Sequence, residues 1–337
     1  MRKSILTCLI ALVGIGAQKP APTPTPTPAA TTPAAPATAT PPPAPTAPKL
    51  PLVKQIRKTV SFIELVCQEG DKAVKEAGTG FFVWYPDERA GKDSGFTYLV
   101  TNRHVAECWD ETRHPMLVKS VSVRVNLVDG SSTVLPLNTK GNVPWIFPPD
   151  ESVDLALIPL APDRNKVDYM TIPISSFVTD DVITSLGITE GAKIMFTGFF
   201  YQFQGERRMQ PIIREGILAM MPDENLVTTT GKSGTVYLGD VHIFGGNSGS
   251  PVFVDLGGFH GNIMRVGEDY RVLGIVSGMF YEDEDFTLRV TTTVKGTAHA
   301  NSGIAMIVPP KFLKNMLESP SVQALRDSEI ASWKKSH

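Results

Sequence analysis

The chain has 337 residues, of which 42% are hydrophobic, and this is enough apolar material for a folded protein with a substantial core. Its 32 basic and 34 acidic residues are mixed along the chain and give a net charge of −2. Because the sequence contains no basic stripe, nucleic acid is excluded as an expected partner.

The first residues have the build of a secretory signal peptide. Arg2 and Lys3 precede an uncharged apolar run over 5–16, which is followed by small residues. A run of about a dozen apolar residues falls short of the roughly 20 that span a bilayer. We therefore expect a signal peptide over 1–17 and an exported protein, either periplasmic, at the cell surface or secreted. Retention of the segment as an anchor, with association to the cell envelope, is the alternative.

The segment over 18–51 is almost wholly Pro, Thr and Ala. Such a composition has too little apolar bulk to form a core. It predicts a disordered, polyproline-like linker between the signal segment and the folded part of the chain.

Two cysteines remain beyond the signal segment, Cys67 and Cys108. In an oxidising compartment they could form one disulfide. Two buried free thiols are equally compatible with the sequence.

From about residue 59 the chain consists of short runs rich in Val, Ile, Phe, Tyr and Thr, separated by Gly, Asp, Asn and Pro. The runs cover residues 60–66, 78–85, 96–102, 121–128, 155–160, 192–203, 234–244, 250–256, 270–280 and 303–310. Runs of this length and spacing are typical of strands in an all-β sandwich or barrel. Near the end of the chain, Ser319 and Pro320 can cap and begin a helix. We therefore expect an all-β fold followed by a helical tail over 311–337.

One short stretch, GGNSGSPVF over 245–253, crowds glycine and serine between extended runs. A serine hydroxyl is a weak nucleophile unless an imidazole base and an orienting carboxylate accompany it. Among the six histidines, His104 alone directly follows a strongly strand-like run. Asp154 stands directly before an apolar strand, where a partly buried carboxylate needs a partner. Taken singly, each of these features is more typical of a turn or a capping residue.

Together the features form an ordered set of segments. These are GTGFFV (78–83), YLVTNRHV (98–105), VDLALIPL (153–160), GGNSGSPVF (245–253) and VLGIVSG (272–278). In this order they resemble the trypsin-like, chymotrypsin-fold serine proteases, especially bacterial Deg-type and glutamyl-endopeptidase-like members. The resemblance covers roughly residues 59–310. It implies two six-stranded antiparallel β-barrels, over 52–180 and 181–310, with the active site in the cleft between them.

The resemblance implies a catalytic triad in the order His, Asp, Ser that this fold uses. His104 in TNRHV would be the general base, Asp154 in VDLAL its orienter, and Ser248 in GNSGSP the nucleophile. Ser250 is the competing serine, but the motif places it two residues beyond the nucleophile.

Gly246, Asn247 and Ser248 would form the oxyanion hole, with the amides of Gly246 and Ser248 directed at the developing oxyanion. Mammalian digestive members carry an aspartate at the position of Asn247, and this aspartate pairs with a newly freed N-terminus. An asparagine cannot form that ion pair, so activation by cutting at an internal N-terminus is not expected. Removal of the residues up to about Pro51 is therefore expected to leave activity intact.

The resemblance also implies a substrate-binding strand. Ser277 would border the aspartate, and the backbone of Ser277, Gly278 and Met279 would pair with an extended polypeptide as an added strand. Glutamate-specific relatives usually carry a histidine at the position of Val276, so acid specificity lacks its usual support. His242, near the expected pocket floor, would favour an acidic or polar P1 side chain, whereas Met279 would narrow the pocket toward small or medium residues. Both alternatives stay open.

No Cys/His spacing suggests zinc, and we expect neither a metal nor an organic cofactor. Only 27 residues follow Pro310, too few for the PDZ module that many Deg-type proteases carry. The expected function is an exported serine endopeptidase that cleaves polypeptides through an acyl-enzyme. The alternative is a catalytically silent trypsin-like fold that acts as a cell-surface binding protein. The natural substrate and the oligomeric state are not constrained.

Overall fold

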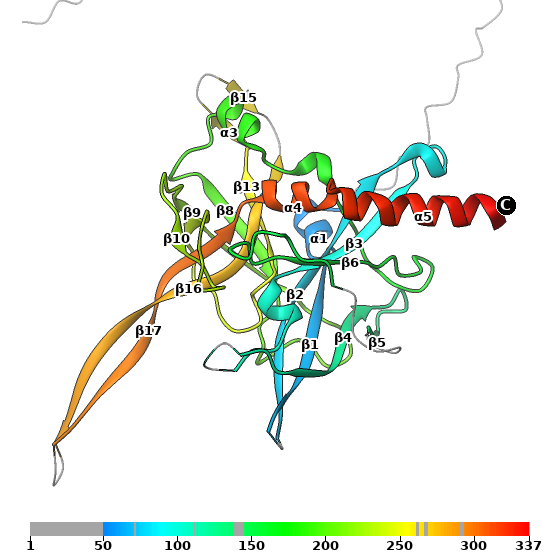
Figure 1. Ribbon diagram of the computed structural model, residues 1–337. Helices are drawn as coiled ribbons and strands as arrows, with labels where there is room; N and C mark the ends of the chain where they lie inside the picture. The colour runs from blue at the N-terminus through cyan, green and yellow to red at the C-terminus, as the bar shows by residue number, and fades with distance from the viewer. Residues whose placement is uncertain are drawn as a thin grey trace, which may run out of the picture. The chain divides into compact units, whose positions relative to one another are not determined.

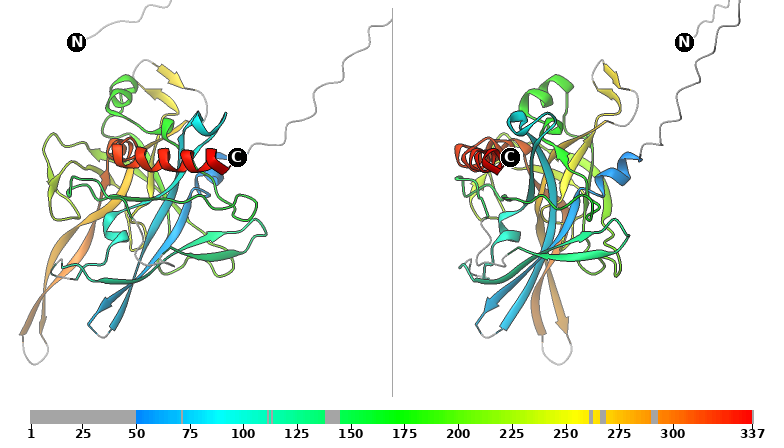
Figure 2. Two further views of the ribbon diagram at one scale, coloured as in Figure 1. Left: turned by 45° about the vertical axis from the view of Figure 1, so that its right-hand side comes forward. Right: turned by 90° about the vertical axis from the view of Figure 1, so that its right-hand side faces the viewer.

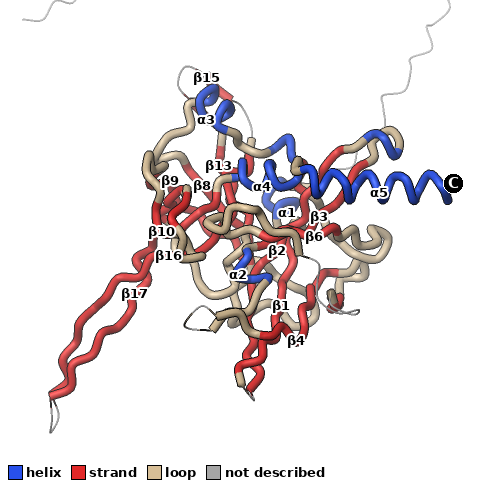
Figure 3. Tube along the Cα trace, viewed as in Figure 1, coloured by secondary structure: helices blue, strands red, loops and turns tan. Residues whose placement is uncertain are grey.

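The computed structural model describes residues 50–336 apart from 71, 111, 113, 138–144, 261–262, 266–268 and 290–292. The expected signal peptide, and the expected linker except for its last two residues, lie outside the described residues. Strands dominate the described part of the chain (Figure 3). None of its helices combines the length and the apolar character needed to cross a membrane.

The first half of the chain forms a seven-stranded sheet. Its strands are β1 (Val60–Glu69), β2 (Lys72–Pro86), β3 (Gly95–Thr101), β4 (Leu117–Asn126), β5 (Ser132–Pro136), β6 (Ala156–Pro159) and β7 (Ile172–Pro173). The order is β5-β4-β1-β2-β3-β6, and β7 pairs in parallel with β2. Alternate residues of β1, Ile63, Leu65 and Cys67, are fully buried on one face in a core shared with β4. This alternation explains why β1 was recognisable from its sequence.

The expectation of a closed first barrel is not met, because this sheet is open in the described residues. Its two edge strands are β5 and β6, which have five and four residues and each pair with one other strand of the sheet. Both strands end on a proline, Pro136 and Pro159, which has no backbone N–H to donate to a further strand. Among the described residues, the outer side of β6 forms only an isolated antiparallel bridge, between Leu157 and Ile146, and the sheet does not close.

The second half forms the closed six-stranded antiparallel barrel that the sequence predicts. It comprises β8 (Lys193–Gly198), β9 (Ile212–Met220), β12 (Tyr237–Asp240), β13 (Pro251–Asp255), β16 (Tyr270–Arg289) and β17 (Thr293–Val308). The closed order is β12-β17-β16-β13-β8-β9. Two small hairpins accompany the barrel, β10 (Leu226–Val227) with β11 (Ser233–Gly234), and β14 (Gly258–His260) with β15 (Ile263–Arg265). Buried Phe196, Leu218 and Leu273 fill the interior.

Two hairpins extend beyond the sheets that they belong to. β16 and β17 continue past the barrel as a long, twisted two-stranded arm, drawn in gold and orange in Figure 1. The β1–β2 hairpin projects from the same end of the body in both views of Figure 2. The arm begins just after the segment of β16 expected to bind substrate, so that segment belongs to a strand that is paired along its length with β17.

One hydrophobic cluster joins the open sheet to the barrel. It includes Phe81 and Leu155 from the first half of the chain and Phe199 and Ile275 from the second. Phe62 and Phe199 meet edge to face with their ring centroids 5.7 Å apart. Since the two halves share this hydrophobic core, side chains contributed by both can be held in a fixed relation.

The helices are α1 (Leu52–Ile56), α2 (Arg103–Ala106), α3 (Asp180–Leu186), α4 (Pro310–Leu317) and α5 (Pro320–Ser336), with short 3-10 turns η1 (Glu88–Ala90) and η2 (Ile174–Ser176). The last two helices confirm the predicted helical tail. Pro320 is the first residue of α5, and the Ser319 hydroxyl accepts the Val322 amide at 3.4 Å, as a capping residue does.

Arg326 anchors α5 against the open sheet. Its side chain is 4% exposed, and its guanidinium lies 4.1 Å from the centre of the Tyr85 ring. One of its nitrogens donates to the Tyr98 hydroxyl at 3.2 Å and to the Leu317 carbonyl at 2.8 Å. The tail is therefore packed onto β2 and β3.

Cys67 and Cys108 form a disulfide, with their Cα atoms 5.7 Å apart. Both residues are buried. The bond fastens the segment that follows α2 to β1, and the choice between a disulfide and two free thiols is thereby decided for the folded chain.

Candidate active site

His104 lies at the point where a strand gives way to a single helical turn. β3 ends at Thr101, and the carbonyl of Asn102 accepts the Ala106 amide at 3.2 Å, which begins α2. The buried Asn102 side chain donates to the Asp154 backbone carbonyl at 2.8 Å. The start of the turn is therefore tied to the segment before β6, and the imidazole is held between them with 36% of its side chain exposed.

Asp154 is fully buried and binds His104 twice. One carboxylate oxygen accepts the His104 backbone amide at 3.1 Å, and the other lies 2.7 Å from Nδ1 of the ring. A carboxylate only accepts, so Nδ1 carries the proton in this pair. In the neutral ring Nε2 then keeps its lone pair, which is the tautomer required of a general base.

Two hydroxyls complete the surroundings of the Asp154 carboxylate. Ser277 Oγ lies 2.5 Å and Thr229 Oγ1 2.6 Å from the same oxygen that binds the imidazole. Ser277 was expected beside the aspartate, whereas sequence reasoning missed Thr229. Thr229 lies in the loop between β10 and β11, where one threonine among several carries no signal of its partner. Only the folding of this loop against β16 reveals its role.

The pKa values of the pair are shifted in opposite directions. Burial alone would raise the pKa of Asp154, but the charge and hydrogen bond of His104, with the two hydroxyls, outweigh it and lower that pKa to about 2. Burial alone would lower the pKa of His104, but Asp154 and, more weakly, Glu76 outweigh it and raise that pKa above its ordinary value. Asp154 therefore stays ionised, and the imidazolium is stabilised.

The turn that carries Ser248 depends on two glycines in the left-handed region. Gly246 has φ +94° and Gly249 φ +86°. A Cβ at Gly246 would lie 2.8 Å from the Phe199 carbonyl oxygen, and one at Gly249 would clash with the Thr79 carbonyl oxygen. The Thr79 amide also donates to the Ser248 carbonyl at 2.8 Å, so the turn packs directly on β2.

Asn247 secures this turn from inside. Its side chain is buried, accepts the Phe244 amide at 2.8 Å and donates to the Phe199 carbonyl at 2.8 Å. Its own amide donates to the Phe244 carbonyl at 3.0 Å and is not free to meet an oxyanion. Within the described residues no partner is found for the amides of Gly246 and Ser248.

The orientation of the Gly246 amide follows from its neighbour. The carbonyl of Gly245 accepts the Tyr201 amide at 3.2 Å. Because the C=O and N–H of one peptide point in opposite directions, the N–H of Gly246 points away from Tyr201.

Ser248 and Ser250 differ in their surroundings. Ser250 is fully buried, whereas Ser248 is partly exposed. Ser248 Oγ lies 3.4 Å from the Ser277 carbonyl oxygen, and no hydrogen bond to His104 is formed among the described residues. Ser277 thus touches Ser248 through its carbonyl and Asp154 through its hydroxyl. The structure brings these residues to one place, with the serine hydroxyl turned toward β16.

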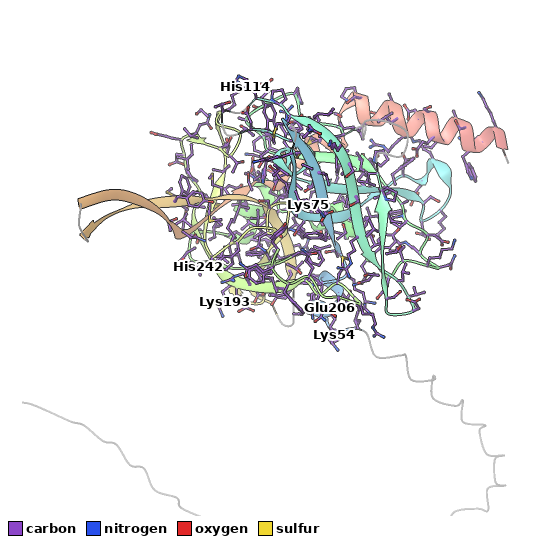
Figure 4. All side chains as sticks on the ribbon, turned by 90° about the horizontal axis from the view of Figure 1, so that it is seen from below. Lys54, Lys75, His114, Lys193, Glu206 and His242 are labelled. Atoms are coloured by element: carbon purple, nitrogen blue, oxygen red, sulfur yellow. A yellow bond between two sulfur atoms is a disulfide. The ribbon has the colours of Figure 1, made fainter. Side chains whose placement is uncertain are left out.

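Of the expected substrate-binding residues, Gly278 and Met279 lie on β16, whereas His242 lies outside this strand. A Cβ at Gly278 would clash with the Thr229 methyl group, so the loop that supports Asp154 approaches β16 closely here. Met279 is half-buried against the barrel core. His242 is exposed two residues after the end of β12, lies against Gly303 of β17, and is labelled in Figure 4 near the base of the arm. No hydrogen bond connects His242 to Ser248 within the described residues.

His104 opens onto a cleft of about 260 Å³. Its other lining residues are Arg103, Glu107, Trp109, Glu151, Thr229, Thr230 and Lys232. The charged members pair with one another, Arg103 with Glu107 and Lys232 with Glu151, each at 3.2 Å. In the part of the chain that is described, no group of His, Cys, Asp or Glu side chains could hold a metal ion.

Comparison with known proteins identifies the family. Residues 78–261 match the trypsin-like peptidase domain. The chain belongs to the trypsin-like peptidase family. Among solved structures it is similar to the crystal structure of Deg5, at 16% sequence identity and a TM-score of 0.40, over 67% of this chain and 82% of that chain. No curated protein matches it. With values this low for the structural likeness, membership of the family rests on the sequence match.

Proposed function

We propose that this chain is a serine endopeptidase in which Ser248 is the nucleophile, His104 the general base and Asp154 its orienting carboxylate. The observation that carries the proposal is the 2.7 Å contact between His104 Nδ1 and the fully buried Asp154 carboxylate. A buried carboxylate that also accepts two hydroxyls can fix both the tautomer and the direction of the ring.

In the proposed reaction, His104 Nε2 takes the proton of Ser248 Oγ as this oxygen attacks the substrate carbonyl carbon. The amides of Gly246 and Ser248 donate to the resulting oxyanion, and Asp154 stabilises the imidazolium. The imidazolium then gives its proton to the leaving amine, which leaves an acyl-enzyme that water hydrolyses. The proposal requires Ser248 Oγ to turn from the Ser277 carbonyl toward His104 Nε2 by rotation about the Cα–Cβ bond, and such hydrogen bonds often form only when substrate binds.

The proposed substrate is an extended polypeptide. The part before the scissile bond would add as a strand to Ser277, Gly278 and Met279 of β16. Export is proposed as well, because the N-terminal segment has the build of a signal peptide and the Cys67–Cys108 disulfide is favoured in an oxidising compartment.

A fluorophosphonate probe tests this function directly. We expect the parent to be labelled, Ser248→Ala to be unlabelled, and Ser250→Ala to be labelled like the parent, since Ser250 is fully buried. Circular dichroism would verify that each variant is folded. Absence of label on a folded parent, or equal labelling of the parent and Ser248→Ala, would contradict the proposal and favour a catalytically silent binding protein.

A further inference from the structure

Glu76 lies on β2, close to the candidate catalytic residues. It is two residues before Gly78, so both residues present the same face of the strand. A Cβ at Gly78 would lie 2.6 Å from the Val105 side chain and 3.1 Å from the Ser248 carbonyl oxygen. At Gly78, the face of β2 that carries Glu76 is therefore covered by Val105, the residue after His104, and by the turn that carries Ser248.

The register confirms this direction. Glu76 pairs with Leu65 of β1, and directly opposed residues of an antiparallel pair point to the same face. Leu65 belongs to the buried cluster that also contains Val105 and Cys108. Lys75, labelled on this hairpin in Figure 4, points to the other face and pairs with Glu64 at 3.2 Å. The ammonium of Lys75 therefore pairs with Glu64 and not with Glu76.

The Glu76 carboxylate has no partner in the described residues. No hydrogen bond or ion pair reaches it, although the side chain is partly buried. Burial raises the pKa of Glu76, and His104 opposes this as the one charged group that acts on it within the described residues. His104 in turn is bonded to Asp154, and in the proposed reaction it acts as a base in its neutral form. A partly buried, unpaired carboxylate is costly, so this one is suited to a cation supplied from outside.

The position also indicates which half of a substrate would meet this carboxylate. Ser248 lies between two strands, with its hydroxyl 3.4 Å from the Ser277 carbonyl of β16 and its own carbonyl 2.8 Å from the Thr79 amide of β2. If the part before the scissile bond pairs with β16, the part after it passes the β2 side of Ser248. Glu76 then faces the leaving-group half.

We propose that Glu76 is a specificity-determining residue that receives a lysine or arginine side chain of the polypeptide just after the scissile bond. This inference rests on the proposed peptidase function and adds a substrate class to it. A direct charge pair in a partly desolvated site is expected to favour a basic residue over its neutral counterpart by about 5-fold or more.

The test uses matched peptides that differ only in carrying Lys, Gln or Glu at the first or second position after the scissile bond. We expect the parent to show a higher kcat/KM for the Lys peptide than for the Gln peptide, and Glu76→Gln to bring the ratio close to one. Glu76→Lys should favour the Glu peptide. The ratio within one variant cancels any effect of Glu76 on His104, because both peptides meet the same triad.

Glu64→Gln is the matched control. Glu64 lies on the neighbouring strand opposite Ala77, hence on the other face of the sheet, and is paired with Lys75. Its Lys-to-Gln ratio should equal that of the parent. Equal ratios in the parent, Glu76→Gln and Glu76→Lys would overturn the inference while leaving the peptidase proposal intact.

A binding measurement separates the two proposals. The same peptides are titrated calorimetrically into Ser248→Ala and into Ser248→Ala with Glu76→Gln. Tighter binding of the Lys peptide that Glu76→Gln abolishes supports the role of Glu76. This holds even if the parent is not labelled by a fluorophosphonate, and in that case only the peptidase proposal fails. Binding without such a preference, or no binding at all, overturns the role of Glu76.

Discussion

The disulfide between Cys67 and Cys108 provides a prediction whose size follows from the structure. The two residues are 41 positions apart. In the chain-entropy treatment, a closed loop of that length lowers the entropy of the unfolded state enough to stabilise the fold by about 4 kcal/mol. Unfolding entropy is about 2.1 cal/mol/K per residue, so over the compact unit Lys49–His337 the loss corresponds to a fall in Tm of roughly 7 °C.

Thermal unfolding followed by circular dichroism, with and without reductant, measures this difference. The control is the double variant Cys67→Ala, Cys108→Ala, whose Tm should not respond to reductant. In denaturant without reductant, the full chain should expose one thiol, Cys8, and not three. Three reactive thiols, or the same Tm for the parent under both conditions, would refute the reasoning.

Three further changes have expected outcomes. In Asp154→Asn, kcat/KM should fall about 10⁴-fold. The acid limb of the residual pH–rate profile should also move to lower pH. Activity is lost as His104 becomes protonated, and the substitution removes the carboxylate that raises the pKa of His104. Parent and variant limbs at the same pH would contradict this. Gly249→Ala should abolish fluorophosphonate labelling or lower the free energy of unfolding by about 1–3 kcal/mol, because φ at Gly249 is +86° and the added methyl group clashes with β2. Gly245→Ala is the control for the free energy of unfolding, since a Cβ added there meets no atom within 4 Å. Arg326→Met should lower the unfolding free energy in urea by about 3 kcal/mol, since it leaves the buried Leu317 carbonyl without its donor and Asp87 without this cation. Arg326→Lys should not restore the stability, because an ammonium cannot stack on the Tyr85 ring in the same way. Wild-type stability of Arg326→Met would mean that α5 is not held by this contact.

Local pattern was sufficient for the strands with strong alternation or fully apolar runs. β1, β3 and β13 lie where the sequence predicts them, because their buried faces are continuous along the chain. β9 was not predicted. It mixes Arg214, Glu215 and Gly216 with apolar residues, and Ile217 is 40% exposed. The alternation of apolar and polar residues along β9 is therefore weak, and the strand is recognisable only from its pairing in the barrel.

Long-range contacts decided the features that no local pattern encodes. The order of His104, Asp154 and Ser248 along the chain is a property of the sequence. The hydroxyl of Thr229 on Asp154 depends instead on how the loop between β10 and β11 lies against β16. The position of the Glu76 carboxylate, which has no partner among the residues that the structure describes, depends on the register of β1 with β2. The physical reason is that side-chain period determines which face of a strand is buried, whereas partners that are distant in sequence are chosen only when the sheets pack together.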